Sequence, residues 1–284
     1  MRSMTGFGRA SAVVGDALVV VQVNSVNRKT LDLSIRLPEA WSPMETKVAE
    51  KVREVARRGK IHLVVSAEAQ GGSEGQTAAH LERLARLAAE NDVPFEPDVR
   101  LLWEIANDRR TMTEPELTEA LEAGILDAAE EALRSFASMR AQEGEALMID
   151  FLTRTTALKR HVTAIARRAP EVVSTYREAL MKRLREANLE LDVDDERVLR
   201  EVAVFADRCD ISEELTRLDS HLQQFVDHIK GEGEIGRKAE FILQEIGREI
   251  HTIGSKANDL ELSKWVIELK NELERIREQI ANVE

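Results

Sequence analysis

The N-terminal part of the chain shows the alternation of apolar and polar residues that is typical of β-strands. Residues 31–37 place an apolar side chain at every second position, and Pro38 ends the run. Residues 17–23 and 61–67 are rich in β-branched side chains and predict two further strands. Because residues 44–56 have helical spacing, the order strand–strand–helix–strand predicts a small mixed sheet with a helix on one face.

The middle of the chain has helical spacing, which begins after the glycine-rich loop at residues 71–75. Helical runs are predicted over residues 78–91, 114–122 and 125–168, with Gly124 and Gly144 as weak points. Pro170 is expected either to start a new helix or to kink a long one. The polar, acidic stretch 188–195 is interpreted as a hinge between two halves of the chain.

The C-terminal third has the most regular spacing and predicts three helices. The first is expected to run from Val198 to Ile229, and the second to begin near Ile235. The third keeps an unbroken heptad seam from Leu262 to Val283. This seam is expected either to be shared between subunits or to be covered inside a monomeric bundle.

These patterns predict an α+β protein. Its expected parts are an N-terminal sheet domain (1–155), a helical connector (156–195) and a C-terminal helical domain with the active site (196–284). Only 4% of residues are aromatic while 43% are hydrophobic, so the core must consist mainly of Leu, Ile, Val and Ala, a mixture that favours helices. The single cysteine, Cys209, excludes a disulfide scaffold.

The composition argues against a membrane-spanning protein, a secreted protein and a simple DNA-binding protein. No apolar run approaches the roughly 20 residues that span a membrane, and the N-terminus lacks the apolar core of a signal peptide. We therefore expect a cytoplasmic protein with no membrane partner. A net charge of −12 does not fit a simple phosphate-neutralising DNA-binding protein.

Charge is nevertheless distributed unevenly along the helical part. Residues 151–190 are predominantly basic, whereas residues 191–219 are predominantly acidic. This juxtaposition suits an enzyme that holds a polyanion together with a divalent metal. It also suits two solvated helix faces with no further role.

Polar residues interrupt the apolar seams of the C-terminal helices at regular intervals. Two stripes with the same spacing are expected: Asp210, Glu214, Arg217 and His221 on one helix, and Glu245, Glu249, Thr252 and Lys256 on the next. A carboxylate at a seam position must be paired with a cation, protonated or bound to metal, because burying it alone is too costly.

Two interpretations of these stripes are open. In the first, Mn²⁺ or Mg²⁺ is held by Glu214, His221, Glu245 and Glu249, with Asp210 and Glu213 as second choices, while Arg217, Arg248 and Lys256 grip a phosphate. In the second, ion pairs fix the register of the helices, with Glu214 bound to Arg217 or Arg248 and Glu249 bound to Lys256.

Basic residues also gather at the predicted strand ends and turns of the N-terminal part. They are Arg9, Arg28, Lys29, Arg36, Arg58 and Lys60. These side chains could follow a phosphate backbone, or they could protect a sheet edge from aggregation. Since this segment offers only Phe7 and Trp41 as aromatic residues, we expect no stacking platform for bases.

Taken together, these motifs resemble the YicC-like family of bacterial endoribonucleases. The N-terminal matches are residues 2–9 (RSMTGFGR), 25–27 (SVN), 36–38 (RLP) and 58–60 (RGK). The C-terminal matches are residues 210–221 (DISEELTRLDSH), 236–238 (GRK), 244–245 (QE), 248–249 (RE), 252–259 (TIGSKAND) and 277–279 (REQ). The chain departs from the family pattern at Gln22, Asn24, Arg28, Lys29 and His251.

The resemblance implies metal-dependent cleavage of RNA in an oligomeric ring, expected to be a hexamer. Catalysis and phosphate binding are then assigned to Glu214, Arg217, His221, Glu245, Arg248, Glu249 and Lys256, and RNA binding to Arg9, Asn27, Arg28, Lys29, Arg36, Arg58 and Lys60. Two other functions are weighed against this one. The chain could be a ring-forming RNA-binding adaptor for another nuclease, or a purely structural oligomer.

Overall fold

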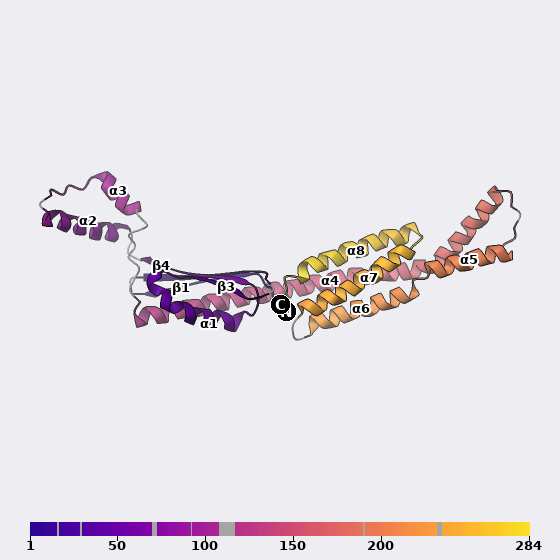
Figure 1. Ribbon diagram of the computed structural model, residues 1–284, viewed down its shortest axis with the longest axis horizontal. Helices are drawn as coiled ribbons and strands as arrows, with labels where there is room; N and C mark the ends of the chain where they lie inside the picture. Colours follow the sequence, from indigo (N-terminus) through magenta and orange to yellow (C-terminus); the bar gives the residue numbers. More distant parts are fainter. Residues whose placement is uncertain are drawn as a thin grey trace. The chain divides into compact units, whose positions relative to one another are not determined.

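A computed structural model describes residues 1–15, 17–28, 30–69, 73–91, 93–107, 117–189, 191–231 and 235–284. Contacts divide the chain into two compact units, one formed by Met4–Arg140 and the other by Met1–Ser3 together with Ala141–Glu284. The first contains a four-stranded sheet and the second is helical (Figure 1), so the predicted α+β architecture is confirmed. The predicted domain boundaries at 155 and 195 stay a prediction.

The sheet consists of β1 (Gly6–Val14), β2 (Ala17–Val26), β3 (Asp32–Arg36) and β4 (Lys60–Ala69). Its spatial order is β1-β2-β4-β3, with β3 parallel to β4 and the other neighbours antiparallel. The three predicted strands correspond to β2, β3 and β4. The additional strand, β1, pairs with the whole length of β2 as a hairpin.

One face of the sheet is covered by helices. The 3₁₀-helix η1 (Glu39–Met44) leads into α1 (Glu45–Val55), which occupies the region of the predicted helix 44–56. This helix and the first part of α4 (Glu119–Glu186) lie on the same side of the sheet in Figure 1. Between them and the sheet, a core of β-branched and aliphatic side chains includes Val21, Val23 and Leu63, all fully buried.

Strand β1 approaches α4 so closely that its inward positions are small. A Cβ atom added to Gly8 would lie 2.1 Å from the Ala132 carbonyl oxygen, and one added to Gly6 would lie 2.7 Å from Arg140 Cγ. Ala10 and Ala12 follow on the same face. Before Val14, the inward face of the strand therefore lacks the large apolar side chains on which strand prediction relies.

Helix α4 is continuous for 68 residues and passes through both predicted weak points and through Pro170. The two glycines are positions of close packing: Cβ atoms added at Gly124 and Gly144 would lie 2.2 Å from Val14 Cγ2 and 2.6 Å from the Met1 carbonyl oxygen. Pro170 is accommodated inside the helix. Before α4, the chain forms α2 (Ser73–Glu90) and α3 (Val99–Asn107), which contact each other.

Four more helices complete the second unit: α5 (Glu196–Cys209), α6 (Ser212–Lys230), α7 (Gly236–Lys256) and α8 (Leu260–Ile280). The prediction of one helix from Val198 to Ile229 is wrong, because the chain is extended at Asp210 (ψ 120°). The Asp210 carboxylate accepts hydrogen bonds from the backbone N–H of Ser212 (2.9 Å) and its hydroxyl (2.6 Å), which begins α6 as a separate helix. Asp210 therefore does not lie on the helical stripe.

The stretch 188–195 joins α4 to α5 within the second compact unit, and the boundary between the two units lies between Arg140 and Ala141. A hinge at residues 188–195 stays a prediction. Beside this connection, the rings of Tyr176 and Phe205 stack with centroids 3.7 Å apart. Tyr176 also donates a hydrogen bond to Glu201, 3.2 Å away. The end of α4 and α5 therefore form a helical hairpin.

The heptad seam of α8 is buried within the single chain. Its residues Leu262, Val266, Leu269, Leu273, Ile276, Ile280 and Val283 belong to one core with residues of α4, α6 and α7. The chain end is fixed by backbone hydrogen bonds between Arg2 and Glu284, at 2.9 and 2.8 Å. Of the two expectations for this seam, the structure thus bears out coverage inside the bundle. None of the helices in the described part of the chain is both long and apolar enough to span a membrane.

Candidate active site

The two predicted polar stripes face each other across the hairpin of α6 and α7. Glu214, Arg217 and His221 lie one turn apart along α6. The stripe of α7 comprises Glu245, Glu249, Thr252 and Lys256. Buried Leu218 and Leu222 hold α6 in place on the same core as Ile246 and Ile253 of α7, so the polar residues border an apolar seam.

The closest contact between the stripes joins Lys256 and Glu214. Lys256 Nζ donates to Glu214 Oε1 at 2.7 Å and to the Asp210 carbonyl oxygen at 2.8 Å. Burial by itself would raise the pKa of the Glu214 carboxyl, but the hydrogen bond and charge of Lys256 outweigh it and hold the pKa below its usual value. Glu214 is therefore an ionised carboxylate at neutral pH.

A second pair lies further along the hairpin. Arg217 Nη1 is 3.9 Å from Glu249 Oε1, and the same guanidinium also binds Glu213 on its own helix. Glu249 is buried, with 4% of its surface exposed, whereas the Arg217 side chain is about half-exposed. The neighbouring pair Arg248–Glu245, at 3.9 Å, lies within α7.

The sequence interpretation with ion pairs therefore names the right residues but the wrong partners. It pairs Glu214 with Arg217 or Arg248 and Glu249 with Lys256, whereas the structure pairs Glu214 with Lys256 and Glu249 with Arg217. The helices are antiparallel, so the beginning of α6 lies beside the end of α7. The position of α6 along the axis of α7, called here the axial offset, decides which residues of the two helices meet.

The predicted metal ligands do not share one coordination point in the structure. Within the described residues, no group of three His, Cys, Asp or Glu side chains is arranged to hold an ion. Glu214 Oε2 is buried without a hydrogen-bond partner among those residues, but its other oxygen binds Lys256. Because Glu249 is also beside a cation, these carboxylates as placed do not fit a shared ion, and metal dependence stays a prediction.

Comparison with known proteins agrees with the resemblance seen in the motifs. A domain described as "Endoribonuclease YicC-like, N-terminal region" matches residues 1–148, and "Endoribonuclease YicC-like, C-terminal" matches residues 165–284. The chain belongs to the YicC-like endoribonuclease family. The "Probable endoribonuclease YicC" of Clostridioides difficile (strain 630) is 34% identical over 99% of both chains, and the protein of the same name from Haemophilus influenzae is 30% identical over 99% of both.

The YicC-like C-terminal domain contains both polar stripes, whereas the basic residues predicted to bind RNA lie in the N-terminal region. Arg9 on β1 and Arg36 on β3 are exposed. Arg28 forms an ion pair with Asp32, and Lys60 begins β4 half-buried. Asn27 and Arg58 each have an interaction partner, and Lys29 lies outside the described residues.

Four more side chains lie on the same sheet face as Arg9 and Arg36, and the sequence analysis did not place them together there. They are Phe7, Gln22, Asn24 and His62, which the pairing register brings side by side. The alternation of Phe7 and Arg9 with two glycines is the signal that could have revealed this face. It was overlooked because β1 was not predicted.

Two residues of the basic stretch 151–190 of this YicC-like chain, Arg154 and Arg168, have a structural role. Arg154 binds Asp150 and Glu272, at 2.7 and 3.0 Å. Arg168 binds Asp259, which in turn caps the N-terminus of α8 through the backbone N–H groups of residues 261 and 262. These contacts attach α4 to α8, so this part of the stretch is not available for a polyanion.

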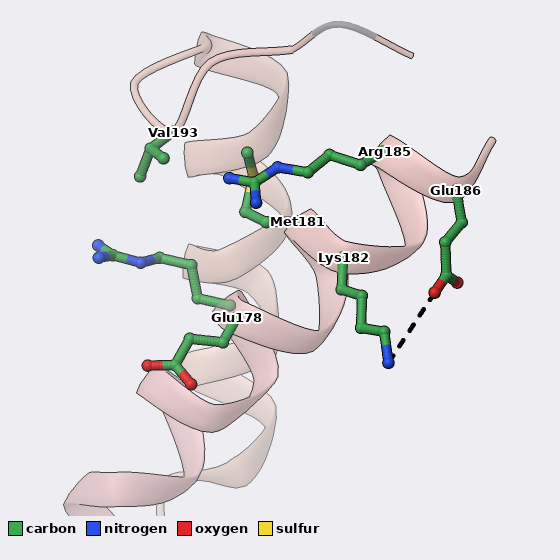
Figure 2. A pocket seen from close by; sticks show the side chains of 7 residues that line it. Glu178, Met181, Lys182, Arg185, Glu186 and Val193 are labelled. Atoms are coloured by element: carbon green, nitrogen blue, oxygen red, sulfur yellow. Dashed lines mark ion pairs between the residues drawn. The ribbon is translucent and has the colours of Figure 1, made fainter. Parts of the chain in front are cut away.

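A hollow of about 370 Å³ lies at the hairpin of α4 and α5 (Figure 2). It is lined by Arg177, Glu178, Met181, Lys182, Arg185, Glu186 and Val193. Lys182 Nζ is 3.9 Å from the Glu186 carboxylate, as the dashed line in Figure 2 marks. None of the lining residues belongs to α6 or α7, so this hollow is not part of the polar stripes.

Proposed function

We propose that this chain is an endoribonuclease that cuts phosphodiester bonds within single-stranded or structured RNA, at the polar stripes of α6 and α7. The observation that carries the proposal is the contact of Lys256 with Glu214 beside the buried Glu249 and Arg217. Cations and ionised carboxylates at close range are the side chains that phosphoryl transfer requires. The names of the two relatives support the same activity.

Three cations at this site are suited to binding the scissile phosphate. Lys256 is fixed by two hydrogen bonds, to Glu214 and the Asp210 carbonyl, so its ammonium group needs little reorganisation. The guanidinium groups of Arg217 and Arg248 are exposed over 53% and 73% of the side chain. Either can offer two parallel N–H groups to phosphate oxygens.

Proton transfer in the proposed reaction falls to His221 and Glu249. His221 follows Arg217 by one helical turn and is half-buried, and an imidazole can both donate and accept a proton. Glu249 lies 3.9 Å from Arg217, and its carboxylate is the buried group on α7 that is proposed as the base. The roles of acid and base are assigned to these two side chains together.

The test is cleavage of end-labelled single-stranded RNA by the full chain, with Mn²⁺, with Mg²⁺ and with a chelator. Glu249→Gln should lower the rate about 100-fold or more, because the substitution keeps size but removes the base. Glu240→Gln, an exposed position on the same helix, is the matched control and should cut at the wild-type rate. Analysis of the new RNA ends distinguishes attack by the 2′-hydroxyl from attack by water.

Each other outcome selects a different function. Cleavage that Glu249→Gln leaves unchanged, together with a lowered melting temperature, would assign Glu249 to helix register alone. Wild-type protein that binds RNA without cutting it under any metal condition would be an adaptor. Protein that neither binds nor cuts RNA would be a structural oligomer. Loss of cleavage on chelation, restored by Mn²⁺ or Mg²⁺, is the result expected for metal dependence.

Assembly and location complete the proposal. We propose a cytoplasmic homo-oligomer, a hexamer, on the resemblance to the family. Because the α8 seam is buried inside the chain, subunit contacts must use other surfaces. Light scattering of the full chain measures the number of subunits directly.

A further inference from the structure

The sheet has an open face, turned away from α1 and α4, that carries a mixed set of side chains across all four strands. The pairing register places Phe7, Asn24, His62 and Ser34 in one row, and Arg9, Gln22, Val64 and Arg36 in the next. We call these eight residues the open face. Figure 1 shows both covering helices on the other side of the sheet.

Side chains of the open face are exposed to solvent, and several of them have no hydrogen bond or ion pair with other described residues. Phe7 is 47% exposed and Val64 40% exposed, whereas the inward residues of β2 are fully buried. The side chains of Arg9, Asn24 and Arg36 make no hydrogen bond or ion pair with any other described residue. An aromatic ring and several hydrogen-bonding groups therefore face solvent together on a rigid support.

The dimensions of the sheet fix how these groups are spaced. Neighbouring strands lie about 4.8 Å apart, so Arg9 and Arg36 on the two edge strands are separated by roughly 14 Å. The two rows differ by two residues along each strand, which is roughly 7 Å. A positive charge thus stands at each edge, with Phe7, Asn24 and His62 in the adjacent row.

We propose that the open face binds unpaired nucleotides of the RNA substrate. Phe7 stacks on a base, the Asn24 amide and His62 ring bond to base edges, and Arg9 and Arg36 hold phosphates. Open four-stranded sheets with exposed aromatic rings recognise single-stranded RNA in this way. This inference rests on the proposed function, because it names the part of the RNA that the first unit contacts.

Charge favours RNA over a second copy of the chain as the occupant. In a protein of net charge −12, the open face carries two cations without a carboxylate partner among the described residues. A two-fold contact between two such faces would bring like charges together and leave their desolvation uncompensated. A polyanion compensates both charges and covers the exposed ring.

Binding of fluorescent single-stranded RNA to the full chain tests the proposal, in a Glu249→Gln background that limits cleavage. Phe7→Leu should weaken binding roughly tenfold, because leucine keeps apolar bulk but cannot stack. Phe7→Tyr should restore it. An abasic strand of the same length should bind both variants equally, and Phe241→Leu, which changes an exposed phenylalanine on α7, is the matched control.

The proposed contacts of Arg9 and Arg36 with phosphates are tested by the salt dependence of RNA binding. Arg9→Gln with Arg36→Gln should weaken binding to normal and abasic strands alike, and should lower the slope of log K against log salt by about 0.7 for each lost contact. Equal RNA affinity of Phe7→Leu and wild type would overturn the proposal. So would a change in oligomer size caused by Phe7→Leu, because the face would then be a protein interface.

The same measurements distinguish failure of the proposed endoribonuclease activity from failure of the proposed RNA-binding face. If wild-type protein does not cut RNA but Phe7→Leu still weakens binding, the open face stands and the chain is an adaptor. If wild-type protein cuts RNA while Phe7→Leu binds it normally, the endoribonuclease stands and the open face is refuted.

Discussion

Replacing Lys256 by methionine should destabilise the helical unit because it leaves the buried carboxylate of Glu214 without its cation. Glu214 is held ionised by Lys256, and its second oxygen is already buried without a partner among the described residues. Breaking a fully buried ion pair costs about 3–5 kcal/mol, whereas an exposed pair contributes at most about 1 kcal/mol. With the Glu214 side chain 11% exposed and Lys256 34% exposed, we expect a loss of about 2 kcal/mol at pH 7.

The pH dependence of this loss follows from the direction of the shift. In the wild type, the lowered pKa of Glu214 stabilises the fold above the ordinary carboxyl pKa, and this contribution is lost as pH falls through the folded-state pKa. In Lys256→Met, burial dominates, so the pKa of Glu214 should rise. The destabilisation should then be largest at neutral pH and should shrink as the carboxyl becomes protonated.

Urea unfolding of the full chain at pH 7 and pH 4, followed by circular dichroism, measures both effects. The double variant Glu214→Gln with Lys256→Met removes both charges and is the control, expected to recover most of the lost stability at pH 7. Equal stability of Lys256→Met and wild type would refute the reasoning. A double variant as unstable as Lys256→Met would show that lost packing, not a stranded charge, causes the effect.

Three further predictions concern packing and the chain end. Gly8→Ala should destabilise the sheet unit by about 3 kcal/mol in thermal unfolding, because its Cβ would meet the Ala132 backbone, which cannot move aside cheaply. Arg168→Ala should make stability less sensitive to acid between pH 7 and pH 3, because Arg168 is the main cause of the lowered pKa of Asp259; an unchanged acid profile would contradict this. Deleting residues 276–284 removes part of the α8 seam, and should unfold the helical unit by circular dichroism rather than release folded, smaller particles.

The sequence predicts the strands and helices correctly where large apolar side chains recur with the spacing of that element. Strands β2 and β4 are found because Val21 and Leu63 belong to runs of β-branched and aliphatic residues. Strand β1 is missed because its inward positions before Val14 are Gly6, Gly8, Ala10 and Ala12, which allow close packing but give a weak apolar signal. The same ambiguity applies to Gly124, where a small residue is needed for close approach but is read as a helix break.

The candidate site was predictable only in part, for a geometric reason. Helical spacing tells which residues share a stripe, and the structure brings Glu214 and Lys256 together from the two stripes as expected of facing helices. Spacing does not give the axial offset between two helices, and that offset decides which cation meets which carboxylate. Asp210 lies outside the stripe because its backbone is extended and its carboxylate binds the N–H and hydroxyl of Ser212, a local interaction that apolar periodicity does not record.

The axial offset also indicates which residues of α7 lie at the same height as His221. Each step of four residues forward along α6 corresponds to four residues back along antiparallel α7. Counting from the Glu214–Lys256 contact at 2.7 Å places His221 level with Glu249, and counting from the Arg217–Glu249 pair at 3.9 Å places it level with Glu245, one turn away. If His221 and Glu249 act as one unit in proton transfer, His221→Ala and Glu249→Gln should each lower the rate of RNA cleavage, and the double variant should be no slower than the worse single variant. Rate losses that multiply in the double variant would show independent roles, and the offset would then describe only how the helices pack.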